Sequence, residues 1–256
     1  MFLPRISLLL LIASTTAFGA ELMREPGAML REGTWIDDVG AYSVPQAFEK
    51  IKPANWPVDS WYRLTLVSDH LLSEPVIAPP GQMPAFLRSI VTQLETRATG
   101  STPSQSSSPV QAREWVDQLY LRVPGSHLLE GSIPAYVFKN GTSTLRPKLD
   151  YRYELQLGGL SFAFTVQNGL RGKNGEAYGA GAQYTIEYDG NKYEYSLGEF
   201  GWDSTIRAIA DLDGDGKPDF IVTIGGNNSG YEAVLLSSRA KPGKNPATAS
   251  LFQIGC

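Results

Sequence analysis

Alternation of apolar and polar residues is the dominant pattern in the C-terminal part of this chain. The segments 151–157 and 160–166 both alternate in this way, and Gly158 and Gly159 lie between them. A Gly-Gly pair between two alternating runs predicts a β-hairpin, because both glycines can adopt a positive φ. A second hairpin is expected around Asp189-Gly190-Asn191. Further strands are expected at 62–66, 119–123, 135–139, 184–188, 192–195, 205–210, 220–224 and 232–237.

Short strands joined by short links predict a mainly β protein, α+β overall, whose C-terminal domain is antiparallel and rich in hairpins. Roughly nine such strands can fold as a sandwich, a barrel or a partial propeller-like array. The region before residue 99 is mixed. Residues 46–51 predict a short helix that ends at Pro53, and Pro84 begins a longer one. The longer helix carries one apolar stripe, which we interpret as a core face: Phe86, Leu87, Ile90, Val91 and Leu94.

Composition suggests where the chain divides. Residues 99–110 are almost entirely Ser, Thr, Pro, Gly and Gln, which cannot pack, so this segment is predicted to be a flexible linker. It separates a small α/β region at 20–98 from a β-rich domain at 111–256. The 26 glycines and 17 prolines favour a β protein rich in loops over a helix bundle.

The first 19 residues have the three parts of a secretory signal peptide. Arg5 provides a positive charge, residues 6–12 are apolar, and small residues follow at 13–20. The apolar run is too short to span a bilayer, which needs about 20 residues. Cleavage after Gly19 or after Ala17 is expected, and the alternative is a buried N-terminal strand. The interpretation predicts a secreted or periplasmic protein with no membrane span.

The charge limits which classes of partner are expected, and the cysteine content limits how the fold can be stabilised. The formal net charge is −4 and no basic run is present, so nucleic acid is not expected as a partner. Cys256 is the only cysteine, which excludes an internal disulfide. The fold is therefore expected to depend on its core, to which a bound metal ion could add stability.

Residues 211–219 have the spacing of a loop that wraps a cation. Asp211, Asp213, Asp215 and Asp219 stand at positions 1, 3, 5 and 9, a glycine stands at position 6, and Lys217 at position 7 offers its backbone carbonyl. Two carboxylates about 4 Å apart repel by about 4 kcal/mol at an effective dielectric constant of 20. Four of them must protonate, stay spread in solvent or bind a cation. An all-oxygen ligand set favours Ca²⁺ over zinc or copper.

This loop differs from an EF-hand. Position 12 is Val222, where an EF-hand needs a bidentate Glu, and the flanking segments are predicted strands. We therefore expect a hairpin that binds calcium, and the alternative is a solvated acidic turn without metal.

The segment 208–222, Ala-Ile-Ala-Asp-Leu-Asp-Gly-Asp-Gly-Lys-Pro-Asp-Phe-Ile-Val, resembles the calcium loop of FG-GAP and VCBS-type repeats. The resemblance covers about 30 residues, with 225–230 and 233–236 similar to the turn and outer strand of such a repeat. It implies that the aspartates at 211, 213, 215 and 219 bind calcium. Propellers stack about 4–8 blades, and residues 111–256 have room for about three. A single repeat-like hairpin in a smaller β domain is therefore expected.

Other residues suggest further sites, each with an ordinary structural alternative. His70 and His127, the only histidines, occur in similar strand-then-turn contexts and could share a site or mark two similar hairpins. The glycine-rich segment 169–175 is interpreted as a hairpin loop rather than a phosphate cradle. Five residues could form an aromatic strip for sugars or the core face of a sheet: Tyr184, Ile186, Tyr188, Tyr193 and Tyr195.

The predicted function is a non-catalytic, calcium-stabilised binding or cell-envelope module, with a protein or a glycan as possible ligand. The alternative is a secreted hydrolase that acts on glycans. That alternative requires Glu187, Glu194 or Asp203 to face a cleft near Trp202. The exposed face of the 184–195 hairpin separates the two hypotheses.

Overall fold

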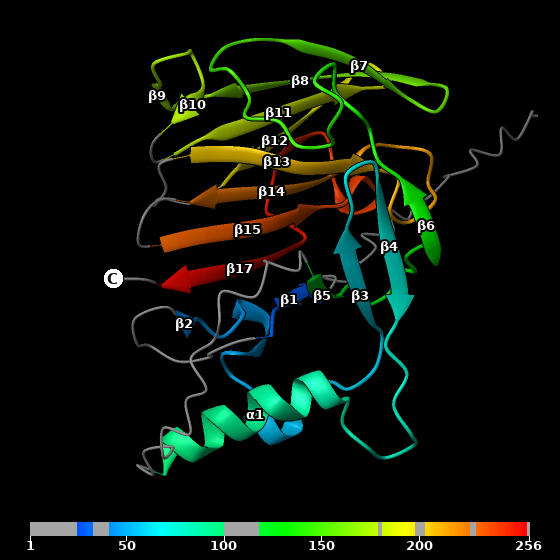
Figure 1. Cartoon of the computed structure of the whole chain (residues 1–256), viewed down its shortest axis with the longest axis vertical. Coiled ribbons are helices and arrows are strands. Elements are labelled where there is room, and N and C mark those ends of the chain that lie inside the picture. The colour runs from blue at the N-terminus through cyan, green and yellow to red at the C-terminus, as the bar shows by residue number, and fades with distance from the viewer. Residues whose placement is uncertain are drawn as a thin grey trace, which may run out of the picture.

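The computed structural model describes residues 25–32, 41–99, 118–178, 181–197, 203–225 and 229–254. The protein is mainly β, with 46% strand and one α-helix in this part of the chain. Its strands form three sheets, none of which closes into a barrel. Every pairing of named strands is antiparallel except one. Figure 1 shows the three sheets and the helix. No helix among the described residues is long and apolar enough to cross a membrane.

The first sheet has the order β1-β5-β3-β4-β6. Its strands are β1 (Ala28–Leu30), β3 (Trp61–Leu66), β4 (His70–Pro75), β5 (Gln118–Arg122) and β6 (Gly131–Pro134). The helix α1 (Ala85–Ala98) packs against it, and its Phe86 ring stacks on Tyr120 of β5 with the ring centroids 3.8 Å apart. Two 3₁₀ turns, η1 (Gln46–Phe48) and η2 (Pro53–Asn55), precede β3. The sheet therefore combines strands from the predicted 20–98 region with strands from the predicted 111–256 domain.

The second sheet has the order β2-β17-β15-β14-β13-β10-β9. Its strands are β2 (Ala41–Tyr42), β9 (Leu170–Arg171), β10 (Ala177–Tyr178), β13 (Asp203–Ala210), β14 (Asp219–Gly225), β15 (Ser229–Leu235) and β17 (Ala249–Ile254). A register irregularity lies between Ile206 and Ala208 of β13. The 3₁₀ turn η3 (Ser237–Arg239) follows β15 directly.

The third sheet has the order β16-β12-β11-β8-β7. Its strands are β7 (Tyr153–Leu157), β8 (Leu160–Gln167), β11 (Gln183–Tyr188), β12 (Asn191–Ser196) and β16 (Gly243–Asn245), the last parallel to β12. In Figure 1 this sheet lies beyond β13, on the side opposite to β17 and α1.

Two buried clusters hold the sheets together, and the second sheet contributes to both. In β14 the side chains of Phe220, Val222 and Ile224 belong to the cluster shared with the third sheet, which we call the second core. Ile221 of β14 belongs instead to the cluster shared with the first sheet and α1, which we call the first core. Successive residues of a strand point to opposite faces, so β14 reaches both cores.

Both predicted hairpins are confirmed. Gly158 connects β7 to β8 with φ +56°, and Asp189 and Gly190 connect β11 to β12 with φ +51° and +73°. The helix after Pro84 is also confirmed, and four of its five stripe residues are buried. The remaining one, Leu94, is partly buried against the first core.

Two predicted elements are wrong in type or place. The helix expected at 46–51 is reduced to η1, because the chain turns twice through Phe48, where Phe48 N–H donates to Pro45 O and Ile51 N–H to Phe48 O. The strand expected at 135–139 is displaced: the observed strand in this region is β6, which ends at Pro134. Beyond a single bridge at Ala135, the chain turns back at Phe138, whose N–H donates to Thr142 O. The predicted signal peptide, the predicted linker apart from Thr99, and Trp202 lie outside the described residues.

Candidate metal centre

The loop between β13 and β14, residues 211–219, forms the candidate site and is called the acid loop below. Its ends are fixed by the pairing of Ala210 with Asp219 in the second sheet. Gly214 and Gly216 have φ of +75° and +78°, a conformation that glycine adopts without strain. These two positions allow the chain to reverse sharply within the acid loop.

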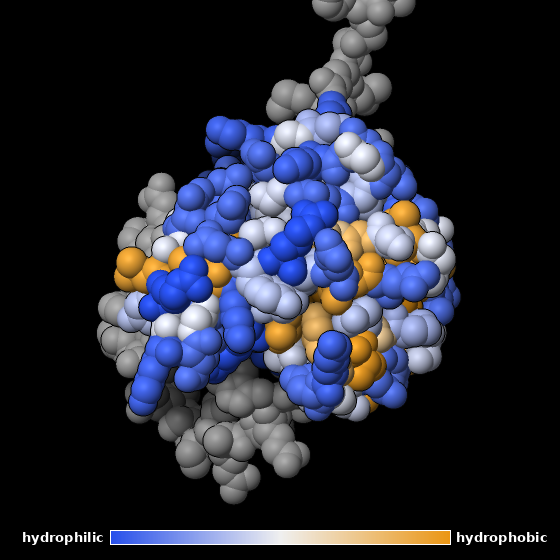
Figure 2. Space-filling view, turned by 90° about the horizontal axis from the view of Figure 1, so that it is seen from above, coloured by the Kyte–Doolittle hydropathy of each residue, from blue (hydrophilic) through white to orange (hydrophobic). Residues whose placement is uncertain are grey.

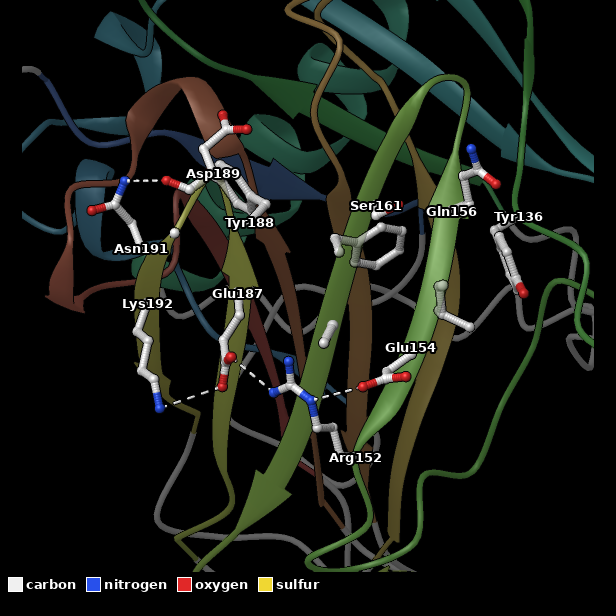
Figure 3. Close-up of a pocket in the computed structure, with 14 residues that line it drawn as sticks. Tyr136, Arg152, Glu154, Gln156, Ser161, Glu187, Tyr188, Asp189, Asn191 and Lys192 are labelled. Atoms are coloured by element: carbon white, nitrogen blue, oxygen red, sulfur yellow. Dashed lines mark hydrogen bonds and ion pairs between the residues drawn. The ribbon is translucent and has the colours of Figure 1, made fainter.

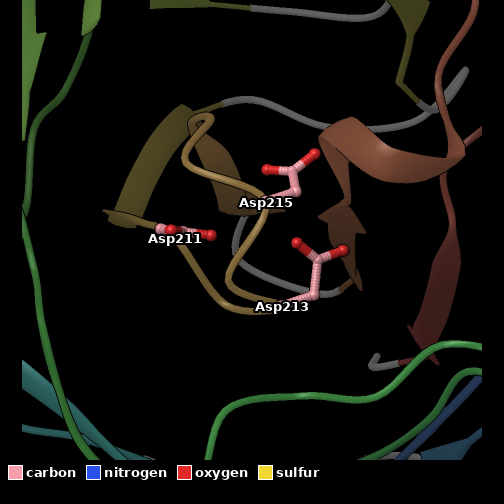
Figure 4. Close-up of side chains that lie close together, drawn as sticks. All are labelled: Asp211, Asp213 and Asp215. Atoms are coloured by element: carbon pink, nitrogen blue, oxygen red, sulfur yellow. The ribbon is translucent and has the colours of Figure 1, made fainter. Parts of the chain in front are cut away.

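The acid loop brings three of the predicted carboxylates together. Asp211, Asp213 and Asp215, called the carboxylate triad, each offer an oxygen atom, and these atoms lie within 4.8 Å of one another. Figure 4 shows the three side chains around a common space. Asp211 Oδ2 accepts the Gly216 N–H at 3.0 Å, and Asp215 Oδ1 accepts the Lys217 N–H at 2.9 Å. Two carboxylates of the triad, Asp211 and Asp215, are thus held by the backbone of their own loop.

Two oxygens of the triad lack the hydrogen bonds that buried polar atoms usually have. In the described part of the chain, Asp211 Oδ1 and Asp213 Oδ1 are buried and have no hydrogen-bond partner. Buried polar atoms without a partner are uncommon in native proteins, and a bound ion is one explanation for them. These two oxygens are therefore the strongest sign that the triad could hold a metal ion.

Asp219 is placed differently from the triad. Its side chain is buried, Oδ2 accepts the Leu212 N–H at 2.7 Å, and Oδ1 accepts the Ser237 N–H at 2.7 Å. Both oxygens are thus engaged by backbone donors from two different segments. Asp219 connects the acid loop to η3, and the group of mutually close metal-ligand atoms does not include it.

The side chain of Lys217 reaches the ring of Tyr188 on β11, with Nζ 5.8 Å from the ring centre. The backbone carbonyl of Lys217 remains the group proposed for ligation.

The turn η3 provides polar groups that the sequence analysis did not identify. Ser237 Oγ lies 3.0 Å from each oxygen of Asp215 and 2.8 Å from Asp219 Oδ1. Ser238 Oγ contacts Asp213 Oδ2. These serines are 18 to 25 residues from their partners in the chain, so no local spacing reveals them.

Burial and mutual repulsion act on the carboxyl groups of the site. Burial raises the pKa of Asp219 well above its ordinary value, and the charge of Asp213 raises it further, against the backbone N–H groups of Ser237 and Leu212. Burial also raises the pKa of Asp213; the Ser238 hydroxyl opposes this shift, and the charge of Asp215 adds to it. The fully ionised cluster is therefore unfavourable without a positive charge.

A segment from the first sheet supports the acid loop from outside. After β5 the chain passes through residues 124–130, where Leu129 N–H donates to Leu212 O at 2.7 Å. Arg239 of η3 donates to Ser126 Oγ at 3.0 Å and also to Pro124 O. The acid loop is thus bordered by two segments that are distant from it in sequence, 124–130 and η3.

The predicted aromatic strip is a core face, which was the structural alternative. Tyr184, Ile186, Tyr188, Tyr193 and Tyr195 are all buried in the second core. The tyrosines therefore stabilise the contact between the second and third sheets.

The two histidines have different partners. His70 Nδ1 is 2.7 Å from Asp69 Oδ1, whereas the His127 ring contacts the Tyr62 ring.

The acids named by the hydrolase hypothesis do not form one group. Glu187 and Glu194 lie on the same face of the β11–β12 hairpin, where they are paired with Lys192 and Thr185, and Asp203 lies in the second sheet. Glu187 forms ion pairs with Arg152 at 2.8 Å and with Lys192 at 3.5 Å. It borders an open groove of about 670 Å³ on the third sheet (Figure 3). Arg152 lowers the pKa of Glu187. Asp203 borders another hollow, on the side of β9 and β10. The face seen in Figure 2, which looks down onto Figure 1 from above, is mostly hydrophilic with small hydrophobic patches.

The glycine-rich segment forms the short β9–β10 hairpin, as interpreted from the sequence. Gly172 N–H donates to Glu176 O at 2.8 Å, and Gly175 N–H donates to Gly172 O at 3.0 Å. The hairpin extends the edge of the second sheet beside β13. The N–H groups of Gly172 and Gly175 are therefore used in hydrogen bonds within the hairpin.

Among the described residues, the acid loop is the one group of three or more metal-ligating side chains that lie close together. Its donors are all oxygen atoms, which suit hard cations, and the triad alone does not select calcium over other such ions. No family model, no curated protein and no solved structure matches this chain.

Proposed function

We propose that this protein is an exported, calcium-binding β protein in which the carboxylate triad holds a structural Ca²⁺. Its role is then a non-catalytic binding or cell-envelope function, with a protein or a glycan as ligand. The observation that carries the proposal is the pair of buried, unpartnered oxygens, Asp211 Oδ1 and Asp213 Oδ1.

A bound cation explains the acid loop better than the two alternatives. Three ionised carboxylates within 4.8 Å of one another repel by on the order of 3 kcal/mol for each pair at an effective dielectric constant of 20. Spreading them into solvent would break the hydrogen bonds from Gly216 N–H and Lys217 N–H that hold Asp211 and Asp215 in place. Protonation at Asp211 Oδ1 or Asp213 Oδ1 would create a hydroxyl donor where the described residues provide no hydrogen-bond partner.

Calcium is the best fit among hard cations. The loop offers several flexible oxygen ligands, whereas Mg²⁺ demands strict octahedral geometry and keeps its waters. The resemblance of 208–222 to FG-GAP and VCBS-type calcium loops and the signal-like N-terminus both favour an extracellular calcium site. In this proposal Lys217 contributes its carbonyl, and Asp219 orders the loop around the ion directly or through its backbone contacts.

We also propose that the second and third sheets form a β-sandwich that carries a single repeat-like hairpin. The shared second core, with side chains from β8, β11, β13 and β14, supports a sandwich over a partial propeller. The hairpin β13–β14 then presents the acid loop at one end of the sandwich.

Thermal unfolding with calcium and with chelator tests the calcium proposal. Extracellular calcium modules have Kd values of about 10⁻⁴–10⁻³ M, so 10 mM Ca²⁺ is about 10–100 times Kd and would stabilise by about 1.4–2.7 kcal/mol. For a chain of this size we expect Tm to rise by about 3–10 °C. Asp213→Asn should remove the rise, and Asp203→Asn, whose carboxylate lies outside the acid loop, should retain it.

Identical melting curves in calcium and in chelator, together with no retained metal, would refute the proposal. Export has its own test. Mass spectrometry of the chain recovered outside the cytoplasm should show loss of the first 17 or 19 residues, and an intact N-terminus there would contradict it.

A further inference from the structure

We propose that η3 is the second half of the cation site: Ser237 Oγ binds the ion as a neutral ligand, and Ser238 Oγ holds Asp213 so that its other oxygen faces the ion. This inference rests on the proposed calcium site and goes beyond the acid loop. It assigns two residues that the spacing of the aspartates does not include.

When Asp215 and Asp219 are both ionised, the contacts of Ser237 cannot all be ordinary hydrogen bonds. Its Oγ lies within 3.0 Å of three carboxylate oxygens, two on Asp215 and one on Asp219. A hydroxyl carries one proton, and ionised carboxylates only accept. At least one of these contacts therefore places oxygen against oxygen without a proton between them. A cation bound by the hydroxyl lone pairs removes this conflict.

The position of η3 is fixed by bonds other than those of the two hydroxyl groups. Ser237 N–H donates to Asp219 Oδ1 at 2.7 Å, Leu236 N–H donates to Thr248 Oγ1 at 2.9 Å, and Arg239 binds residues of the 124–130 segment. The hydroxyls are thus presented to the triad by a turn that is already anchored. Prepositioned ligands of this kind reduce the cost of ordering a site.

The hydrogen bonds of Asp219 leave a ligand position of the ion that a neutral oxygen atom can occupy. Both of its oxygens accept backbone hydrogen bonds, from Leu212 and Ser237, which limits what it offers to an ion. Calcium takes 6–8 oxygen ligands, and the triad with the Lys217 carbonyl supplies fewer unless some carboxylates are bidentate. Ser237 Oγ is the closest hydroxyl to Asp219, at 2.8 Å from Oδ1.

Ser238 has a different task, because it contacts Asp213 through Oδ2. The other oxygen of this carboxylate, Oδ1, is the buried atom without a partner. A donor on one carboxylate oxygen orients the second one toward a metal, as outer-shell partners of metal ligands commonly do. We therefore assign Ser238 as a positioning residue.

Calcium and magnesium titrations of the full chain by calorimetry test the two assignments. Ser237→Ala should lower Ca²⁺ affinity at least about tenfold and change Mg²⁺ affinity little, since Mg²⁺ replaces a lost neutral ligand with water. Ser238→Ala should lower both affinities alike, at least about tenfold, and Ser238→Thr should restore them because it keeps the hydroxyl. Ser126→Ala, which touches only the Arg239 side of η3, is the matched control.

Ser237 is buried, so Ser237→Cys under reducing conditions serves as a second variant. Its thiol fills the same space, and sulfur is a poor ligand for calcium. If the Ser237 and Ser238 variants bind Ca²⁺ like Ser126→Ala while Asp213→Asn does not bind, the role of η3 is overturned and the proposed calcium site stands. If the unmodified chain takes up no Ca²⁺, the proposed function fails and this inference fails with it.

Discussion

Replacement of Asp219 by alanine should destabilise the calcium-free protein more than the loss of any other carboxylate in the acid loop. Asp219 is only 1% exposed, and its two oxygens accept the N–H groups of Leu212 and Ser237, both at 2.7 Å. Leu212 and Ser237 are buried as well. Without the carboxylate, neither N–H group can turn to solvent.

The expected magnitude follows from these two donors. A buried donor left without a partner costs about 1–3 kcal/mol, so two of them cost about 2–6 kcal/mol. Part of this is offset, because the variant no longer buries a charge beside Asp213. We expect Asp219→Ala to lower the free energy of unfolding by about 2–4 kcal/mol. Asp219→Asn keeps one acceptor oxygen and should lose about half as much.

Urea unfolding in the presence of chelator measures the effect without a contribution from calcium. The midpoint should fall while the slope of the transition stays constant, because the surface exposed on unfolding is the same. Asp215→Ala is the matched control on the same loop. Asp215 is exposed, its partner Lys217 N–H is only half-buried, and Ser237 Oγ keeps Asp219 Oδ1 as an acceptor, so the loss should stay below about 1 kcal/mol. If Asp219→Ala loses no more than Asp215→Ala, the view that Asp219 anchors η3 to the acid loop is refuted.

Two further predictions concern the surroundings of the site. Gly216→Ala should lower the free energy of unfolding by about 1 kcal/mol, because φ is +78° in open space, and Gly214→Ala should lower it further, because a Cβ there would lie 3.0 Å from Leu129 Cδ2. Equal losses in urea unfolding would show that the leucine contact is unimportant. Arg31 and Glu232 form two 2.8 Å hydrogen bonds with side chains 10% and 17% exposed, so a double-mutant cycle to alanine should give a coupling of about 1–3 kcal/mol. A coupling near zero would count against this pair as a link between the first and second sheets.

Elements with strong local signals could be predicted from the sequence. The β7–β8 and β11–β12 hairpins follow from alternation and from turn residues that tolerate positive φ, and both features are local. The helix after Pro84 has a stripe of apolar residues at helical spacing. For these elements, local preference and tertiary structure agree.

Pairing between distant strands could not be predicted in the same way. The short strands β1 and β2 carry too few residues for a period to be visible, yet each adds an edge to a sheet by pairing with β5 or β17. Strand β4 was not identified, although it pairs with both β3 and β6, because its alternation is only partial and ends in Glu74-Pro75. Such pairings depend on contacts across the chain rather than on local preference.

In the candidate site, too, the local features could be predicted from the sequence and the contacts between distant segments could not. The spacing of Asp211, Asp213 and Asp215 is a local property, and the structure places their carboxylates together. The contacts of Ser237 and Ser238 arise only when β15 has paired with β14 and returned the chain to the acid loop. Serine-serine pairs are common at turns and carry no signal of their own.

The acid loop lies where the two cores of this protein separate, and this position gives a bound ion its effect on stability. Leu212, at the start of the loop, belongs to the first core, and Phe220, directly after it, belongs to the second. The 124–130 segment and η3 meet the loop from the first and second sheets. A chain whose only cysteine is residue 256 cannot join such segments with an internal disulfide. An ion held between the loop and η3 would connect them instead, and its binding free energy would add to the free energy of unfolding because the unfolded chain cannot assemble the site.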